Sequence, residues 1–290
     1  MERRVSDELL DSDSGSEAEI SDALNDLRHI NSWFGGVSTS RAMITGVMRA
    51  RQKQSSPSAL SLLEVAAGSG YVSRRVTAQL SRKGIRLEVT FLDRAFSHLG
   101  NGHIANGTKA SAPRNVVGDA LTLPFSDSSF DLVSCNLFLH HLDSGQIVRF
   151  VNEALRCCRI AVLINDLVRS PLHLAMVYAS LPLYRSRITR NDAPASVKQA
   201  YTANEVTRLL RQTTAAKVDV KYHFLYRMGI VAWKHESKCL ISSWSAPARR
   251  ARRLRFPRLV SGQKSSCWRA QLFLDKKYAE SSYRRNLWNC

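Results

Sequence analysis

Residues 62–76, LLEVAAGSGYVSRRV, constrain the fold more than any other stretch of the sequence. A short apolar run that contains Glu64 leads into a turn with Gly68 and Gly70, and an amphipathic run follows the turn. Strand, glycine-rich turn and helix in this order usually form the nucleotide-binding element of a parallel α/β sheet. The stretch therefore predicts a βα unit with a ligand at its turn.

Strand and helix patterns continue to alternate through most of the chain. Apolar runs predict seven strands, at 61–66, 87–93, 115–120, 130–138, 160–166, 217–225 and 229–235, with a turn at Arg227–Gly229 between the last two. Helical patterns occur at 20–34, ended by Gly35-Gly36, and at 41–53, 71–84 and 97–111, and the pairs Asp143/Gln146 and Thr202/Glu205 each predict a helix start. This alternation predicts a Rossmann-like, doubly wound α/β sheet of seven strands, mostly parallel with an antiparallel closing strand.

Charge divides the chain into three parts. The net charge is +18, and residues 237–290 hold +11 of it, with 13 Lys/Arg and 2 Asp/Glu. Residues 1–19 are acidic and rich in Ser, a composition that favours disorder over packing. We therefore expect an acidic, disordered leader at 1–19, a folded domain at 20–236 and a basic, disordered tail at 237–290. Within the domain, helices occupy 20–53 and an insertion or lid occupies 167–204.

The cysteines and the N-terminus favour a cytoplasmic protein. None of the six cysteines forms a C-x-x-C pair, so the sequence predicts no metal site. Cys135, Cys157 and Cys158 lie in apolar runs, which indicates buried side chains. The acidic N-terminus lacks the apolar core of a signal peptide, and the longest apolar stretch, 171–184, is too short to span a bilayer.

Polar residues recur where the predicted strands end. A doubly wound sheet binds its ligand beyond the C-terminal ends of its strands. The residues expected along that rim are Glu64, the turn up to Gly70, Asp93, Asp119, Ala120, Asn136 and Asp166. Asp93 is placed to accept protons from both ribose hydroxyls of a nucleoside, and Asp119 with Ala120 can meet an adenine edge. The rim therefore predicts a nucleoside ligand.

The turn departs from the pattern that binds a dinucleotide. The third glycine of G-x-G-x-x-G is replaced by Ser73, and that glycine normally allows close helix packing. Glu64 would also repel a pyrophosphate at the helix N-terminus. A cationic nucleoside without phosphate suits these residues better, which describes S-adenosylmethionine.

The sequence resembles the class I S-adenosylmethionine-dependent methyltransferases over about residues 25–236. LLEVAAGSG resembles their first motif, FLDR their second, and GDALTLPFSDSSFDLVSCNLFLHHL (118–142) the stretch that follows in the small-molecule, methyltransferase type 11 or quinone-methyltransferase-like branch. Ala66 stands where the family usually has glycine. The resemblance implies that Glu64, Ala66, Gly68 and Gly70 hold the methionine end of the donor, Asp93 the ribose, and Asp119 with Ala120 the adenine, with Arg94 and Asn136 as further cofactor-binding residues.

The predicted acceptor lies between the ends of the fourth and fifth strands. Residues 165–202 resemble the substrate insertion of bacterial methyltransferases found beside polyketide-type biosynthetic enzymes. We expect this insertion to roof the acceptor, with the apolar and aromatic side chains Leu174, Met176, Tyr178 and Tyr184. Methyl transfer depends mainly on positioning and needs a base only when the acceptor must lose a proton. His140, His141 and Asp166 are the candidate catalytic residues.

The predicted function is methyl transfer (EC 2.1.1.-) from S-adenosylmethionine to a small organic acceptor, through a hydroxyl of a phenolic, quinone or polyketide-type metabolite. Two alternatives stay open. One is an RNA-modifying methyltransferase that holds nucleic acid with its basic tail, PARRARRLRFPRL (247–259). The chain has NLFL after the fourth strand, where base-amine methylators usually carry an N-P-P-Y-type tetrapeptide. The other is a non-catalytic protein that binds S-adenosylmethionine.

Overall fold

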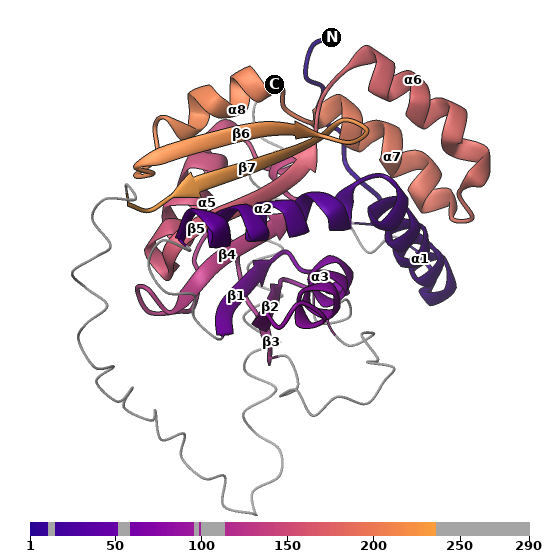
Figure 1. Ribbon diagram of the computed structural model, residues 1–290. Helices are drawn as coiled ribbons and strands as arrows, with labels where there is room; N and C mark the ends of the chain where they lie inside the picture. Colours follow the sequence, from indigo (N-terminus) through magenta and orange to yellow (C-terminus); the bar gives the residue numbers. More distant parts are fainter. Residues whose placement is uncertain (11–14, 52–58, 96–98, 100–113, 236–290) are drawn as a thin grey trace, which may run out of the picture. The chain divides into compact units, whose positions relative to one another are not determined.

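The computed structural model describes residues 1–10, 15–51, 59–95, 99 and 114–235. Its sheet has the strand order β3-β2-β1-β4-β5-β7-β6 (Figure 1). The strands are β1 (Ala59–Val65), β2 (Arg86–Asp93), β3 (Arg114–Val117), β4 (Phe130–Asn136), β5 (Cys158–Leu167), β6 (Lys217–His223) and β7 (Arg227–Trp233). The first five strands are parallel, and β7 runs antiparallel to both of its neighbours. This topology confirms the predicted doubly wound sheet with an antiparallel closing strand.

The turn between β6 and β7 lies earlier in the chain than predicted. His223 pairs with Arg227, and Leu225 and Tyr226 between them have φ of 52° and 58°. The prediction at Arg227–Gly229 was wrong because it assigned the glycine to a turn. Gly229 instead lies inside β7, where a Cβ atom would come within 2.7 Å of the His223 ring. Close packing, rather than chain reversal, requires glycine there.

Helices cover both faces of the sheet (Figure 1). They are α1 (Glu17–Trp33), α2 (Gly36–Arg51), α3 (Tyr71–Ser81), α5 (Ser144–Cys157), α6 (Pro171–Ser180), α7 (Arg187–Gln199) and α8 (Ala203–Leu210), with short 3₁₀ helices at η2 (Leu139–His141) and η3 (Leu181–Leu183). Both predicted capping boxes, at the starts of α5 and α8, are confirmed. The break after α1 is narrower than predicted, because Gly36 already begins α2. The helix predicted at 97–111 lies outside the described residues, apart from Leu99.

Successive side chains along the central strands point to opposite faces of the sheet, so the core consists of two clusters, one on each face. Leu62 of β1 and Leu132 of β4 pack in one cluster with residues of α2 and α3. The adjacent residues Leu63 and Val133 pack in a second cluster with residues of α5 and α8. Because successive side chains of a strand point to opposite faces, this period-2 pattern fixes the sheet between two helical layers. The C-terminal ends of β1, β2, β4 and β5 are thereby held at one edge.

The first ten residues pack against the domain. Asp192 of α7 accepts the backbone N–H groups of Leu9 at 2.9 Å and Leu10 at 3.0 Å. This differs from the leader expected at 1–19. Composition shows how polar such a segment is, but it does not show that a distant residue such as Asp192 supplies the bonds that hold it. Helix α1 also begins inside that range, since Ser16 and Glu19 form a capping box.

The structure also bears on the expectations for the cysteines and for a membrane span. Cys135, Cys157 and Cys158 are buried, as predicted. Among the described helices, none combines the length and the apolar character that crossing a membrane requires. The predicted tail at 237–290 lies outside the described residues, so its boundary stays a prediction.

Candidate active site

A cavity of about 1120 Å³ lies at the C-terminal edge of the parallel strands. Its lining includes ten of the twelve candidate residues, namely Glu64, Ala66, Gly68, Asp93, Arg94, Asp119, Ala120, Asn136, His140 and His141. Most of the rim expected from the sequence therefore lines a single cavity. Gly70 and Asp166 lie outside its lining.

Asp93 holds the turn after β1 in place. Its Oδ2 accepts the backbone N–H of Gly68 at 2.7 Å, and its Oδ1 accepts that of Ala95 at 3.0 Å. Gly68 has φ +51°, and no heavy atom lies within 4 Å of the position that its Cβ would take. The backbone at Gly68 consequently leaves open space beside the cavity, as a ligand in close contact with the main chain needs.

Gly70 packs closely against Phe91 and does not line the cavity. It has φ +65° at the start of α3, and a Cβ atom there would lie 2.7 Å from the Phe91 ring. Ala66 has φ 52° and so adopts the left-handed conformation without being glycine. The backbone at Ala66 thus has the left-handed conformation that glycine adopts easily. For an L-residue this conformation is strained and destabilises the fold.

These two positions predict stability changes of opposite sign. Ala66→Gly should stabilise the fold by up to about 1 kcal/mol, because relief of the left-handed strain exceeds the extra chain entropy of glycine. Gly70→Ala should destabilise it by about 1–3 kcal/mol, because strain and the clash with Phe91 add together. Urea denaturation, compared at equal m-values, measures both changes. A loss of stability in Ala66→Gly would contradict the assigned strain.

The predicted adenine-side residues lie on more exposed chain. Asp119 is exposed, and its Oδ1 accepts the N–H of Leu121 at 2.8 Å, so it caps its own turn while it lines the cavity. Arg94 is also exposed, and Ala120 is half-buried. All three residues line the cavity. Their contact with an adenine stays a prediction.

Glu64 is a buried carboxyl group with one unused oxygen. It is 2% exposed, and its Oε1 accepts the Asn136 amide at 2.8 Å. Among the described residues, Oε2 has no hydrogen-bond partner. Burial raises the pKa of Glu64 to about 7, although Ser73, Asn136 and Arg74 oppose the shift. An unsatisfied carboxyl oxygen at the cavity wall fits a ligand with a positive charge, such as the ammonium group of S-adenosylmethionine.

A hydrogen-bonded chain behind Glu64 fixes the orientation of Asn136. Its Oδ1 accepts the Ser40 hydroxyl at 2.7 Å and the Asn165 amide at 3.0 Å, which leaves its Nδ2 for Glu64. Asn165 is fully buried and also donates to the Gly36 carbonyl at 2.8 Å. The sequence analysis missed both Ser40 and Asn165. The amide of Asn165 in an otherwise apolar strand was the available signal.

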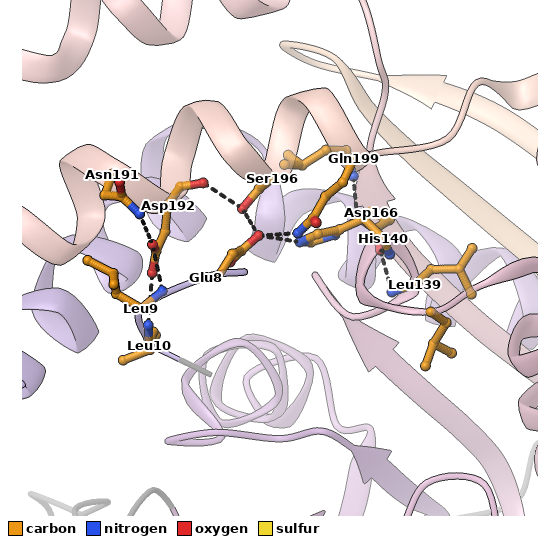
Figure 2. A network of polar contacts seen from close by, with 12 residues as sticks. Glu8, Leu9, Leu10, Leu139, His140, Asp166, Asn191, Asp192, Ser196 and Gln199 are labelled. Atoms are coloured by element: carbon orange, nitrogen blue, oxygen red, sulfur yellow. Dashed lines mark hydrogen bonds and ion pairs between the residues drawn. The ribbon is translucent and has the colours of Figure 1, made fainter. Parts of the chain in front are cut away.

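His140 and Asp166 form a buried pair, and each is 2% exposed (Figure 2). The His140 Nδ1 lies 2.6 Å from the Asp166 Oδ1. Burial raises the pKa of Asp166, but the His140 ring and backbone N–H groups outweigh it and hold that pKa below its usual value. Since an ionised Asp166 only accepts hydrogen bonds, Nδ1 is the donor of this bond, and in a neutral imidazole that tautomer leaves the lone pair on Nε2. Asp166 therefore positions His140 and does not line the cavity.

Glu8 from the N-terminal segment lies on the other side of His140 (Figure 2). Its Oε1 is 3.8 Å from the His140 Nε2 and accepts hydrogen bonds from Ser196, at 2.7 Å, and from Gln199. Possible ligand atoms of Glu8, His140 and His141 lie within 4.8 Å of one another, a grouping that could hold a metal ion. The sequence analysis predicted no metal and missed Glu8, because it placed this residue in an unpacked leader.

The insertion contributes to the cavity, but not through all the predicted side chains. Met176 of α6 and Tyr184, which follows η3, line it. Leu174 and Tyr178 do not, and Tyr178 is 48% exposed. The prediction for these two was wrong because side chains on one helix face several directions, and only part of α6 turns toward the cavity.

Comparisons with known proteins agree on the class of domain. Residues 62–160 match the family model described as a methyltransferase domain. No curated protein matches the chain significantly. Of the solved structures, the plantazolicin methyltransferase BpumL, in complex with a monoazolic desmethylPZN analog and SAH, aligns at a TM-score of 0.53 with 13% identity, over 76% of this chain and 97% of BpumL.

Other solved structures align less well. A SAM-dependent methyltransferase from Aquifex aeolicus has a TM-score of 0.42 and 15% identity, over 61% of this chain and 82% of its own. Magnesium protoporphyrin IX methyltransferase ChlM from Synechocystis PCC 6803, with bound SAH, has a TM-score of 0.44 and 14% identity, over 72% and 84%. At 13% identity the BpumL match establishes the fold alone. The family match identifies a methyltransferase domain over residues 62–160, and the sheet order agrees with the predicted fold.

Proposed function

We propose that this chain, a class I S-adenosylmethionine-dependent methyltransferase, transfers a methyl group to a hydroxyl of a small organic acceptor, such as a phenolic, quinone or polyketide-type metabolite. One observation carries the proposal: Glu64, Asp93 and His140 line the same cavity of about 1120 Å³. Small-molecule sites usually measure about 300–1,000 Å³. The cavity is thus large enough for a nucleoside donor and a small acceptor together.

Residues of β1 and β2 would hold the donor. Glu64 offers its unused oxygen to an ammonium group, Gly68 offers open backbone, and Asp93 offers a carboxylate to ribose hydroxyls. The SAH in the BpumL structure, the best of these structural matches, supports the same class of donor. When bound, S-adenosylmethionine supplies an activated methyl group.

His140 would accept the proton of the acceptor hydroxyl at Nε2. Asp166 keeps Nδ1 as the donor, and it stabilises the imidazolium that forms when the ring takes a second proton. Glu8 lies 3.8 Å from Nε2 and adds a second acid at the same end of the cavity. His141 also lines the cavity and is the other candidate base. The bond from Asp166, which orients an imidazole for proton transfer, goes to the ring of His140. The structure therefore favours His140 as the base.

The pKa of Glu64 predicts how donor affinity depends on pH. A carboxyl with a pKa of about 7 is mostly ionised at pH 8 and mostly neutral at pH 6. Because the ionised form attracts the ammonium group, SAH affinity should fall about tenfold from pH 8 to pH 6. Calorimetry at both values measures this. Glu64→Gln should bind SAH more weakly and equally at both values, and an unchanged pH dependence in that variant would contradict the assignment.

Removal of the tail separates the proposal from its RNA alternative. A chain that ends at Glu236 should bind SAH and methylate a small acceptor as the full chain does, since β7 already completes the sheet. SAH calorimetry and turnover at matched salt test this. If the shortened chain unfolds or loses SAH binding, residues 237–290 belong to the domain. If only RNA methylation is found, and it weakens steeply with salt, the alternative is supported.

The direct test of the proposed function uses the purified protein with methyl-labelled S-adenosylmethionine. It is incubated with panels of phenols, hydroquinones and hydroxylated lipids, and label in an acceptor supports the proposal. Binding of S-adenosylmethionine without transfer to any of them would instead support the non-catalytic alternative.

A further inference from the structure

Arg227, the first residue of β7, is a buried guanidinium group with unused hydrogen-bonding capacity. It is 1% exposed. Its Nε donates to the Phe34 carbonyl at 3.2 Å, and its Nη2 donates to the Asn31 Oδ1 at 3.1 Å. Both partners are neutral, and within the described part of the chain Nη1 has no hydrogen-bond partner. Two neutral bonds tether the side chain without compensating its charge.

The nearby protein charges do not neutralise Arg227 through an ion pair. Asp166 favours its protonated form, but both oxygens of Asp166 already bond to His140 and to backbone N–H groups. None of the ion pairs found among the described residues includes Arg227. Burial lowers the pKa of Arg227 to about 10, with Asp166 opposing, so the group remains a cation at neutral pH. Buried charges are normally paired, because desolvation of a lone charge is costly.

The position of Arg227 places this cation on the acceptor side of the cavity. Arg227 lines the cavity, and it pairs with Leu167 at the end of β5. In the order β1-β4-β5-β7, it lies three strands from Glu64, roughly 14 Å across the sheet at the usual strand spacing. Its partner Leu167 lies further toward the C-terminal end of β5 than Leu163, which is in register with Glu64 through Ser134. Glu64 marks the donor's methionine end, so Arg227 lies beyond the predicted methyl position. The neighbouring His173 does not oppose it as a second cation, since burial and Arg227 lower the pKa of that ring.

We propose that Arg227 binds a carboxylate of the acceptor, so that the methylated hydroxyl belongs to an organic acid. This inference rests on the proposed function, because it needs the acceptor to occupy the same cavity. A guanidinium binds a carboxylate through charge-assisted hydrogen bonds, and the buried Nη1, which has no partner among the described residues, has its hydrogen-bonding capacity unused. The cation that the protein leaves unpaired then receives its counter-charge from the ligand.

Matched pairs of an acid and its amide test the proposal. The probes are 4-hydroxybenzoate with 4-hydroxybenzamide, and the corresponding hydroxynaphthoate and hydroxynaphthamide, titrated by calorimetry into the full chain saturated with SAH. We expect at least one acid to bind about tenfold or more tightly than its amide, as the loss of one charged hydrogen bond implies. Arg227→Met should remove the preference, and Arg227→Lys should keep part of it.

Arg28 provides a matched control. It also lines the cavity but is only half-buried, so Arg28→Met removes one positive charge from a solvent-screened position. This variant should keep the acid preference. SAH affinity, measured in every variant, shows that the protein is folded and that the donor site is intact.

Three binding results would overturn the inference. They are equal affinity for acid and amide in all pairs, an acid preference that persists in Arg227→Met, and a loss of SAH affinity in Arg227→Met and Arg227→Lys without a change in preference. The last result would assign Arg227 to the carboxylate of the donor. Methyl transfer to neutral acceptors alone would overturn this inference and leave the proposed function standing. An acid preference in binding without methyl transfer to any acceptor would support the contact between Arg227 and a carboxylate and contradict the proposed function.

Discussion

Replacing His140 with glutamine should lower the single-turnover rate of methyl transfer to an unactivated alcohol by about 10²–10⁴-fold. The ring is held between Asp166, 2.6 Å from Nδ1, and Glu8, 3.8 Å from Nε2. An alcohol needs a base, because its hydroxyl does not ionise near neutral pH. The same replacement at His141 should cost less, since the Asp166 carboxylate bonds to the ring of His140.

The acidity of the acceptor provides the control for this prediction. With a phenol, positioning should dominate, and Asp166→Asn should cost less than about 100-fold. With nitrophenols, which lose their proton unaided, the loss in His140→Gln should shrink further. SAH affinity should stay normal in each variant. Equal losses for alcohols and nitrophenols would mean that His140 acts through structure rather than as a base.

Replacing Asp93 with alanine should weaken SAH binding by about 1.5–3 kcal/mol, the range for loss of a charged hydrogen-bond partner. That corresponds to roughly 10–150-fold in affinity. Asp93 has two functions here, because it lines the cavity and also accepts the N–H groups of Gly68 and Ala95. Removal of its carboxylate would therefore take away the predicted hydrogen-bond partner of the ribose. It would also loosen the turn that is predicted to hold the methionine end.

Calorimetry on folded protein measures the effect of Asp93→Ala. Asp119→Ala is the matched comparison, since Asp119 lines the same cavity but is exposed, and it should cost less. If Asp93→Ala binds SAH as the wild type does, the ribose assignment fails.

The sheet was predictable because its signals are local. The central strands are short apolar runs, and each predicted rim residue follows from the position where a strand ends. Glu64 and Asp93 were therefore found from sequence alone. Gly229 shows the limit of such signals, because a glycine that avoids a clash with His223 looks the same in sequence as a glycine in a turn.

The missed residues depend on contacts between distant parts of the chain. Glu8 reaches His140 because bonds from α7 hold the N-terminal segment in place, among them those of Asp192 with Leu9 and Leu10 and that of Ser196 with Glu8 itself. Arg227 looks like an ordinary basic residue beside a hairpin, and only burial against the end of α1 shows that its charge lacks a partner. Composition and periodicity contain no information on such pairings. These residues consequently required the structure.

A crystal structure of the full chain with SAH and an acceptor identified by the labelling screen would show where donor and acceptor bind. We expect SAH against Glu64, Gly68 and Asp93, and an acceptor oxygen within about 3 Å of the His140 Nε2 in the same cavity. An acceptor bound outside this cavity, or SAH away from the turn after β1, would contradict this expectation.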